Sequence, residues 1–97
     1  MVFARMATFQ VDDPELIDAE IETTLRYTEG GRLPEGIPAV GFLMMVDRAG
    51  GKVVEVLLFE TEDDLREGDA TMSAMAPGDG SMHRVALDIL GVPVHIP

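Results

Sequence analysis

The sequence predicts an α+β domain with elements in the order strand, helix, strand, strand, helix, strand. Three observations support this order. Residues 13–30 and 61–75 carry the spacing and end signals of helices, a glycine-rich turn joins two apolar runs in the middle, and stretches of strand character open and close the chain. Residues 1–97 fit in a single domain, since chains divide into several domains only well above this length.

The chain opens with a predicted strand at residues 2–10, VFARMATFQ, and continues into the first helix. Asp13 is suited to cap the free N–H groups of this helix, and Pro14 suits its first position. Gly30-Gly31 marks its end. Its apolar residues recur at helical spacing and predict one buried stripe: Leu16, Ile17, Ile21 and Leu25.

A hairpin is predicted after a proline-containing loop at residues 32–40. The apolar runs GFLMMV and VVEVLLF flank residues 47–52. Gly50-Gly51 supplies the positive φ that a short hairpin loop needs.

The second helix is predicted to begin at Thr61, with Asp64 three residues on in a variant of the capping box. Gly68 weakens this helix by about 1 kcal/mol relative to alanine, so we expect it to depend on packing. After the loop APGDG, residues 82–90 predict a last strand. That strand can continue only as an edge, because Pro93 cannot donate to a ladder.

This order of elements is the ferredoxin-like βαββαβ arrangement. Right-handed crossovers set the four strands in the order 4-1-3-2, all antiparallel, with both helices on one face. The other face would expose apolar side chains to water. We expect a second copy of the chain to cover it, which predicts a homodimer.

The composition excludes several kinds of partner and chemistry. A net charge of −11 repels phosphate backbones and anionic lipid, so we expect neither nucleic acid nor membrane as a partner. The absence of cysteine excludes disulfides and thiol chemistry. The longest apolar run, AVGFLMMV, is far shorter than the ~20 residues of a membrane helix, and the opening residues lack a secretory cleavage site. These features predict a cytoplasmic, bacterial-type protein.

The sequence resembles the antibiotic biosynthesis monooxygenase-like group of dimeric α+β barrel proteins. The resemblance lies in the opening FARMATFQ, in VGFLMMVDRAGGKVVEVLLFETEDDLREGDA, and in a closing strand after a glycine-rich loop. The family commonly closes the third strand on Trp-Glu, where this chain has Phe59-Glu60. The resemblance implies a homodimer whose two sheets pack face to face, often around a small cavity.

Strand alternation separates a nearly clean apolar face from a charged face on three strands. We expect the apolar faces to meet the helices; they comprise Val54, Val56 and Leu58, then Val85, Leu87 and Ile89, and finally Val2, Ala4, Met6 and Thr8. The charged residues Arg5, Glu55, Arg84 and Asp88 should then lie together on the opposite face. Glu55 is expected to pair with an arginine, because an unpaired buried carboxylate is costly.

The candidate ligand-binding residues follow from this charged face: Phe3, Arg5, Met44, Glu55, Leu57, Phe59, Arg84 and Asp88. Two interpretations remain open for the charges. They form ion pairs at a dimer interface, or they orient a ligand inside an apolar pocket.

Glu55, His83 and Arg5 are the candidates for catalysis. His83 and His95 lack the partner spacing of a metal site, so no metal and no cofactor are predicted. The methionines Met44, Met72, Met75 and Met82 are more typical of a core than of a cavity.

Two classes of function fit these observations. The first is a homodimer that binds a small apolar or aromatic molecule. The alternative, implied by the resemblance, is a cofactor-independent monooxygenase or an isomerase acting on an aromatic or polyketide-like substrate. Such oxygenases often use Trp, Asn, Tyr or Arg near the substrate. This chain has no tryptophan and no asparagine, and its one tyrosine, Tyr27, lies on the first helix.

Overall fold

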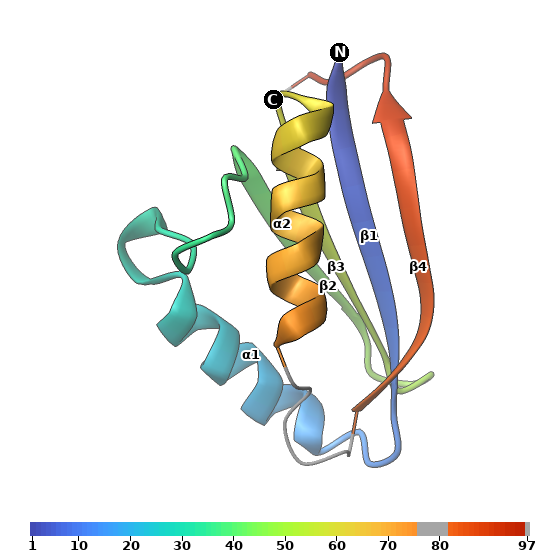
Figure 1. Cartoon of the computed structure of the whole chain (residues 1–97). Helices are drawn as coiled ribbons and strands as arrows, with labels where there is room; N and C mark the ends of the chain where they lie inside the picture. Colours follow the sequence, from blue (N-terminus) through green and yellow to red (C-terminus); the bar gives the residue numbers. More distant parts are fainter. Residues whose placement is uncertain (76–81, 97) are drawn as a thin grey trace.

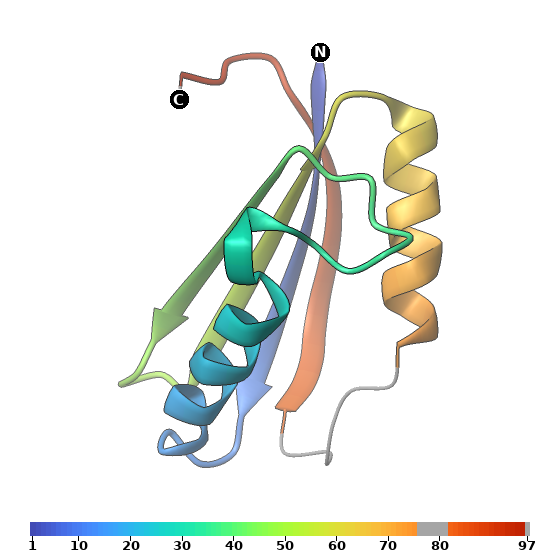
Figure 2. The ribbon, with the colours of Figure 1, turned by 90° about the vertical axis from the view of Figure 1, so that its left-hand side faces the viewer.

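The computed structural model describes residues 1–75 and 82–96 and confirms the predicted α+β fold. Its four antiparallel strands are β1 (Val2–Val11), β2 (Gly41–Asp47), β3 (Lys52–Phe59) and β4 (Met82–Val92). They lie in the order β2-β3-β1-β4, which is the predicted order read from the other edge. Helices α1 (Leu16–Tyr27) and α2 (Glu62–Ala74) cover one face of the sheet (Figures 1 and 2), and a 3₁₀ turn, η1 (Glu29–Gly31), follows α1. The loop expected at residues 76–80 lies outside the described residues.

Local contacts and backbone geometry mark the start of α2, the hairpin turn and the turn before α1. The Thr61 hydroxyl accepts a hydrogen bond from the Asp64 N–H at 3.0 Å, as the capping signal predicted. In the hairpin loop Gly51 has a φ of 63°, the left-handed conformation that glycine adopts without strain. The Asp13 carboxylate accepts from the Glu15 N–H, which belongs to the turn before the helix. Helix α1 therefore begins at Leu16, later than predicted.

The predicted assignment of sheet faces is wrong for β1 and β3. Phe59 and Val53, which share a face with Glu55, are 0% exposed. Phe59 packs in one cluster with Leu65 of α2, and Val53 packs in another with Ile17 of α1. The charged face therefore meets the helices, because it also carries the large apolar side chains that the helices bury.

The predicted alternation also fails along β4. The register between β1 and β4 shifts between Thr8 and Phe9, which adds one residue to β4 at that point. Arg84 pairs with Phe9 and so shares the helix-facing side, whereas Asp88 pairs with Met6 on the opposite side. A one-residue shift exchanges the two faces, so the expected four-charge cluster loses Asp88.

The apolar core consists of two separate clusters, one under each helix. The buried members are Ile37, Leu57, Phe59 and Leu65 in the first cluster, and Val11, Ile17 and Val53 in the second. Figure 2 shows the two helices standing apart over the sheet. Only the first turns of α1 pack against the strands, so Leu25, predicted in the buried stripe, is 64% exposed.

Replacing Gly68 by alanine should destabilise the fold by about 1–3 kcal/mol through overpacking. A Cβ at Gly68 would lie 2.5 Å from Cε1 of the fully buried Phe59, too close for a ring that has no room to move. This cost should exceed the gain of about 1 kcal/mol that alanine brings to a helix. Chemical unfolding of the G68A variant measures the difference.

The exposed Ala70, on the same helix, supplies the control. A70G should lose about 1 kcal/mol by helix propensity alone. A G68A variant more stable than the wild type would contradict the close packing of α2 on Phe59.

Candidate functional site

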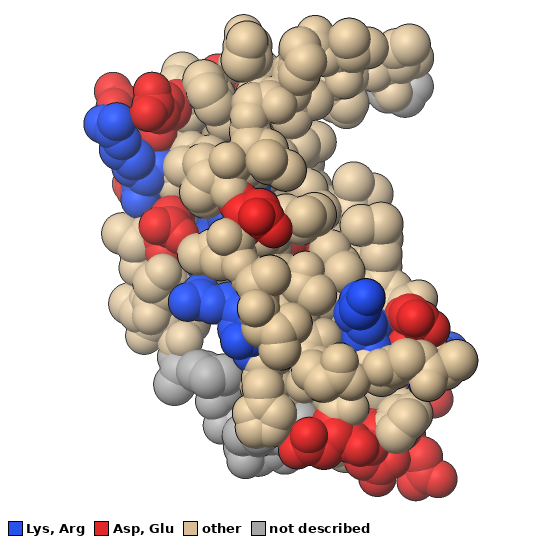
Figure 3. Space-filling model, turned by 90° about the vertical axis from the view of Figure 1, so that its right-hand side faces the viewer, with Lys and Arg blue, Asp and Glu red and all other residues tan. Residues whose placement is uncertain are grey.

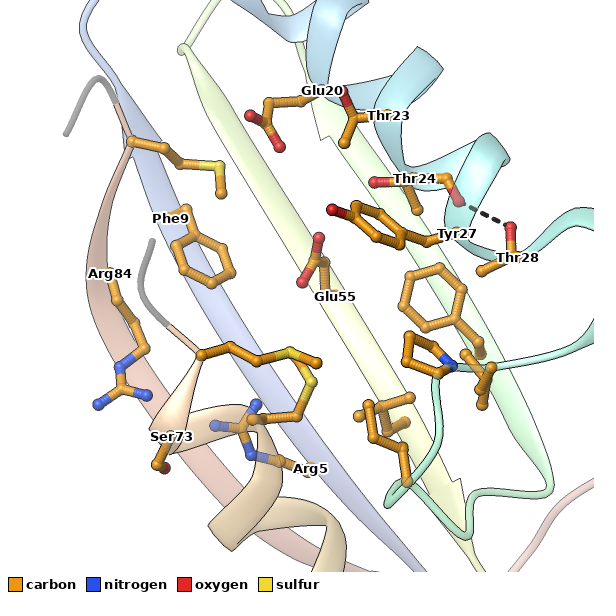
Figure 4. Close-up of a pocket in the computed structure, with 18 residues that line it drawn as sticks. Arg5, Phe9, Glu20, Thr23, Thr24, Tyr27, Thr28, Glu55, Ser73 and Arg84 are labelled. Atoms are coloured by element: carbon orange, nitrogen blue, oxygen red, sulfur yellow. Dashed lines mark hydrogen bonds between the residues drawn. The ribbon is translucent and has the colours of Figure 1, made fainter. Parts of the chain in front are cut away.

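A cavity of about 820 Å³ lies between the sheet and the two helices (Figure 4). This volume is in the range of sites that hold small organic molecules. The sheet contributes Arg5, Phe9, Phe42, Glu55, Leu57, Met82 and Arg84. Helix α1 and the residue that caps its end contribute Glu20, Thr23, Thr24, Tyr27 and Thr28. Helix α2 and its end contribute Met72, Ser73 and Met75, and the loop before β2 contributes Leu33, Pro34 and Ile37. Apolar side chains make up most of the lining.

The wall formed by α1 was not predicted from the sequence. Its lining residues follow the spacing i, i+3, i+4, i+7, i+8 from Glu20 to Thr28, which is one face of a helix. The sequence does carry a signal for this wall, because three threonines and a tyrosine lie on one helix face next to the apolar stripe. This face is polar because it borders the cavity instead of packing on the sheet.

Arg5 is held in the sheet by an ion pair with α2. Its side chain is only 4% exposed, and its Nε donates to Oδ1 of Asp69 at 2.8 Å. Asp69 follows the buried Gly68 and stands four residues after the buried Leu65, so it lies beside the inward side of α2. This position could have indicated a partner for a buried cation. The pair neutralises a charge that would otherwise be costly to bury.

Glu55 lies on the floor of the cavity without the predicted arginine partner. No ion pair and no hydrogen bond to its carboxyl group form within the described part of the chain. Burial raises the pKa of Glu55, the nearby charge of Glu20 raises it further, and Arg5 opposes both effects. A carboxyl group in this state exchanges a proton more readily near neutral pH than an ordinary glutamate does.

Figure 4 places the charged side chains on two sides of the cavity. Arg5 and Arg84 lie toward β4 and α2, and Glu20 and Glu55 lie toward β3 and α1, where Tyr27 also reaches in. The cavity therefore offers a cationic side and an acidic side to one molecule.

The predicted ligand-binding residues divide between the cavity, the core and the opposite face. Arg5, Glu55, Leu57 and Arg84 line the cavity. Phe3 and Phe59 pack under α2, and Met44 packs under α1, so all three belong to the core. Asp88 lies on the other side of the sheet.

The two histidines lie outside the cavity, and the methionines divide between the core and the cavity lining. His83 is exposed, with its Nε2 3.1 Å from Oδ2 of Asp12, and it does not line the cavity. His95 is exposed as well. Met44 packs against the core as predicted. Met72 and Met82 also pack against the core clusters and in addition line the cavity, whereas Met75 lines the cavity without belonging to either cluster.

The side of the sheet away from the helices is a second notable surface, and we call it the open face. The strand pairings place three rows of side chains across it: Gly41, Leu58, Ala4 and Leu90; Leu43, Val56, Met6 and Asp88; Met45, Val54, Thr8 and Ala86. Within these rows Asp88 alone is charged. Figure 3 shows this side, with uncharged atoms over most of the sheet and charged side chains mainly toward the margins.

Comparisons with known proteins add nothing to this geometry: no family model, no curated protein and no solved structure matches the chain. In residues 1–75 and 82–96, no three acidic or histidine side chains come together as a metal site would require. The helices of the same residues are all too short or too polar to span a bilayer.

Glu55→Gln should stabilise the protein increasingly as the pH rises. The folded state binds the Glu55 proton more tightly than the unfolded chain does, so ionising this group opposes folding above its ordinary pKa of 4.5. Glutamine removes that cost. The variant and the wild type should differ little near pH ~4, and the variant should melt a few degrees higher at pH ~8. Unfolding curves across this pH range measure the difference.

Glu60→Gln, at an exposed position beyond the end of β3, controls for the loss of one negative charge. An E55Q effect that does not change with pH, or that reverses, would show that Glu55 is an ordinary solvated or ion-paired carboxylate.

Proposed function

We propose that the protein binds a small apolar or aromatic molecule in the cavity between its sheet and its two helices. The observation that carries this proposal is the cavity itself, about 820 Å³ in volume and lined largely by aromatic, aliphatic and methionine side chains. Burial of an apolar ligand against such a lining supplies most of the affinity. The few charged groups on the floor fix the orientation of the ligand.

The methionines support this assignment. Met72, Met75 and Met82 line the cavity from the end of α2 and the start of β4. Unbranched thioether side chains adapt to ligands of different shape and contact aromatic rings favourably. We therefore propose the class of ligand that the sequence predicts, bound between the sheet and the helices.

A second candidate is a cofactor-independent monooxygenase or an isomerase, as the resemblance to the antibiotic biosynthesis monooxygenase-like group suggests. The raised pKa of Glu55 inside an apolar cavity favours it, because such a carboxylate can take a proton from a phenol or an enolisable carbon. Arg5 would stabilise the resulting oxyanion. Oxygen uptake with an anthrone-type phenol that E55Q abolishes would establish this candidate over simple binding.

We further propose that the protein is a homodimer formed through the open face. Leu43, Met45 and Leu90 are each about half exposed there, and Val56 lies at the centre of the face. A chain of 97 residues buries little apolar surface alone, so a second copy on this face adds much to its stability.

We also propose a cytoplasmic location, with which the absence of cysteine from the sequence agrees.

Thr24→Phe should block the cavity. Thr24 points from α1 toward the sheet, and a phenyl ring there would occupy the space where the ligand lies. Isothermal titration calorimetry with 2-naphthylacetamide should show binding to the wild type and an affinity at least about tenfold lower for T24F, a loss of about 1.4 kcal/mol.

Leu25→Phe is the matched control, because Leu25 is the next residue of the same helix and does not line the cavity. It should leave the affinity unchanged. A wild type that binds neither this probe nor other apolar aromatic molecules would overturn the proposed function.

The dimer predicts a mass of about 21 kDa, twice the 10.5 kDa of one chain, in light scattering at micromolar concentration. Added salt should strengthen association, because each chain carries a net charge of −11 and salt screens the repulsion between two copies.

Val56→Lys should yield monomers, since it places a charge at the centre of the open face. Lys52→Val, at the polar margin, is the control and should leave the dimer intact. A wild type of about 10 kDa at all salt concentrations would contradict the dimer.

A further inference from the structure

The Arg5 guanidinium has hydrogen-bonding capacity that the fold leaves unused. Arg5 is 3% exposed, and its Nε donates a hydrogen bond to Oδ1 of Asp69. Neither terminal nitrogen of Arg5 has a hydrogen-bond partner among the described residues. Every fully buried polar side-chain atom of the described residues has a hydrogen-bond partner. The two terminal nitrogens have none among these residues, so they are not fully buried and must border accessible space. That space is the cavity, which Arg5 lines.

We propose that Arg5 binds the carboxylate of the ligand, so that the cavity takes an apolar or aromatic organic acid. This inference rests on the proposed function and specifies its ligand class. The two terminal nitrogens of a guanidinium form a fork that matches the two oxygens of a carboxylate, and charge-assisted hydrogen bonds of this kind are strong in surroundings that exclude water. The apolar body of the ligand then lies over Leu57 and Phe42, neighbours of Arg5 in the same row of the sheet.

Asp69 serves as a positioning residue in this site. It holds Nε and thereby fixes the plane of the guanidinium while leaving the far edge available. Its carboxylate also offsets part of the positive charge at Arg5, because Oδ1 lies 2.8 Å from Nε. Removing that charge should strengthen the attraction of Arg5 for an anion.

The other charged groups around the cavity are compatible with an anionic ligand. Arg84 of β4 adds a second positive charge on the same side as Arg5. Glu20 and Glu55 lie on the opposite side. Burial favours the protonated form of Glu55, which can donate a hydrogen bond to an oxygen of the ligand instead of repelling it.

A matched pair of probes tests the inference. 2-Naphthylacetate and 2-naphthylacetamide share the same ring and differ in charge. Calorimetry on the wild type should give an affinity at least about tenfold higher for the acid, as expected for a charge-assisted contact. Arg5→Met should bring the two affinities within about twofold of each other, and Asp69→Asn should widen the ratio by about two- to fivefold. Arg66→Met, which removes an exposed arginine of α2 paired with Glu62, should leave the ratio unchanged.

The outcomes separate the two proposals. Equal affinities for acid and amide in the wild type would overturn the role of Arg5 and leave the cavity as a binding site. Binding of neither probe would overturn both proposals. If R5M does not fold, as circular dichroism would show, the D69N variant decides: a ratio that stays unchanged or falls contradicts the inference, and a wider ratio supports it.

Discussion

The position of two charged side chains on the helix-facing side of the sheet constrains the whole molecule. Arg5 and Glu55 stand on adjacent strands, where two helices packed side by side would bury both of them. A buried charge needs a partner or access to solvent. Asp69 meets that need for Arg5, and the cavity meets it for Glu55. The apolar core accordingly divides into one cluster under each helix, with the cavity between them.

The division of the core into two clusters lowers the stability of a single chain, and pairing of two chains through the open face can offset that loss. A core in two small clusters buries less apolar surface than a continuous layer under both helices would, and short chains are marginal in any case. The rows of the open face, in which Asp88 is the one charged residue, remain in contact with water in a single chain. A second copy covering them would place most of this apolar surface at the interface, so that ligand binding and dimerisation use opposite sides of one sheet.

Much of the fold was predictable because its signals are local. The capping pair Thr61 and Asp64, the hairpin glycines and the periodic apolar residues each act within a few residues of the chain. The faces of the sheet were not predictable in this way, because alternation tells which side chains share a face but not which face the helices cover. For β4 even the alternation failed, since one extra residue near Arg84 depends on how β4 pairs with β1.

The candidate site was predicted only in part, because alternation along a strand is a local signal and contacts between distant elements are not. Arg5, Glu55, Leu57 and Arg84 were recovered because they share a parity on their strands, and the extra residue in β4 happened to bring Arg84 to the correct side. Asp69 was missed because its pairing with Arg5 joins positions 64 residues apart. The spacing of Asp69 from the buried Leu65 and Gly68 places it beside the inward side of α2, but it does not identify Arg5 as the partner.

We infer that Glu55 belongs to a ligand cavity and not to an ion pair. Carbon-13 NMR of the Glu55 side-chain carboxyl during a pH titration tests it most directly, with E55Q identifying the resonance. We expect a midpoint above the ordinary pKa of 4.5, because burial and the charge of Glu20 both favour the protonated form. We also expect the signal to shift on addition of 2-naphthylacetate. A midpoint at or below 4.5, with no response to the probe, would show that Glu55 is an ordinary solvated or ion-paired carboxylate that belongs to no ligand site.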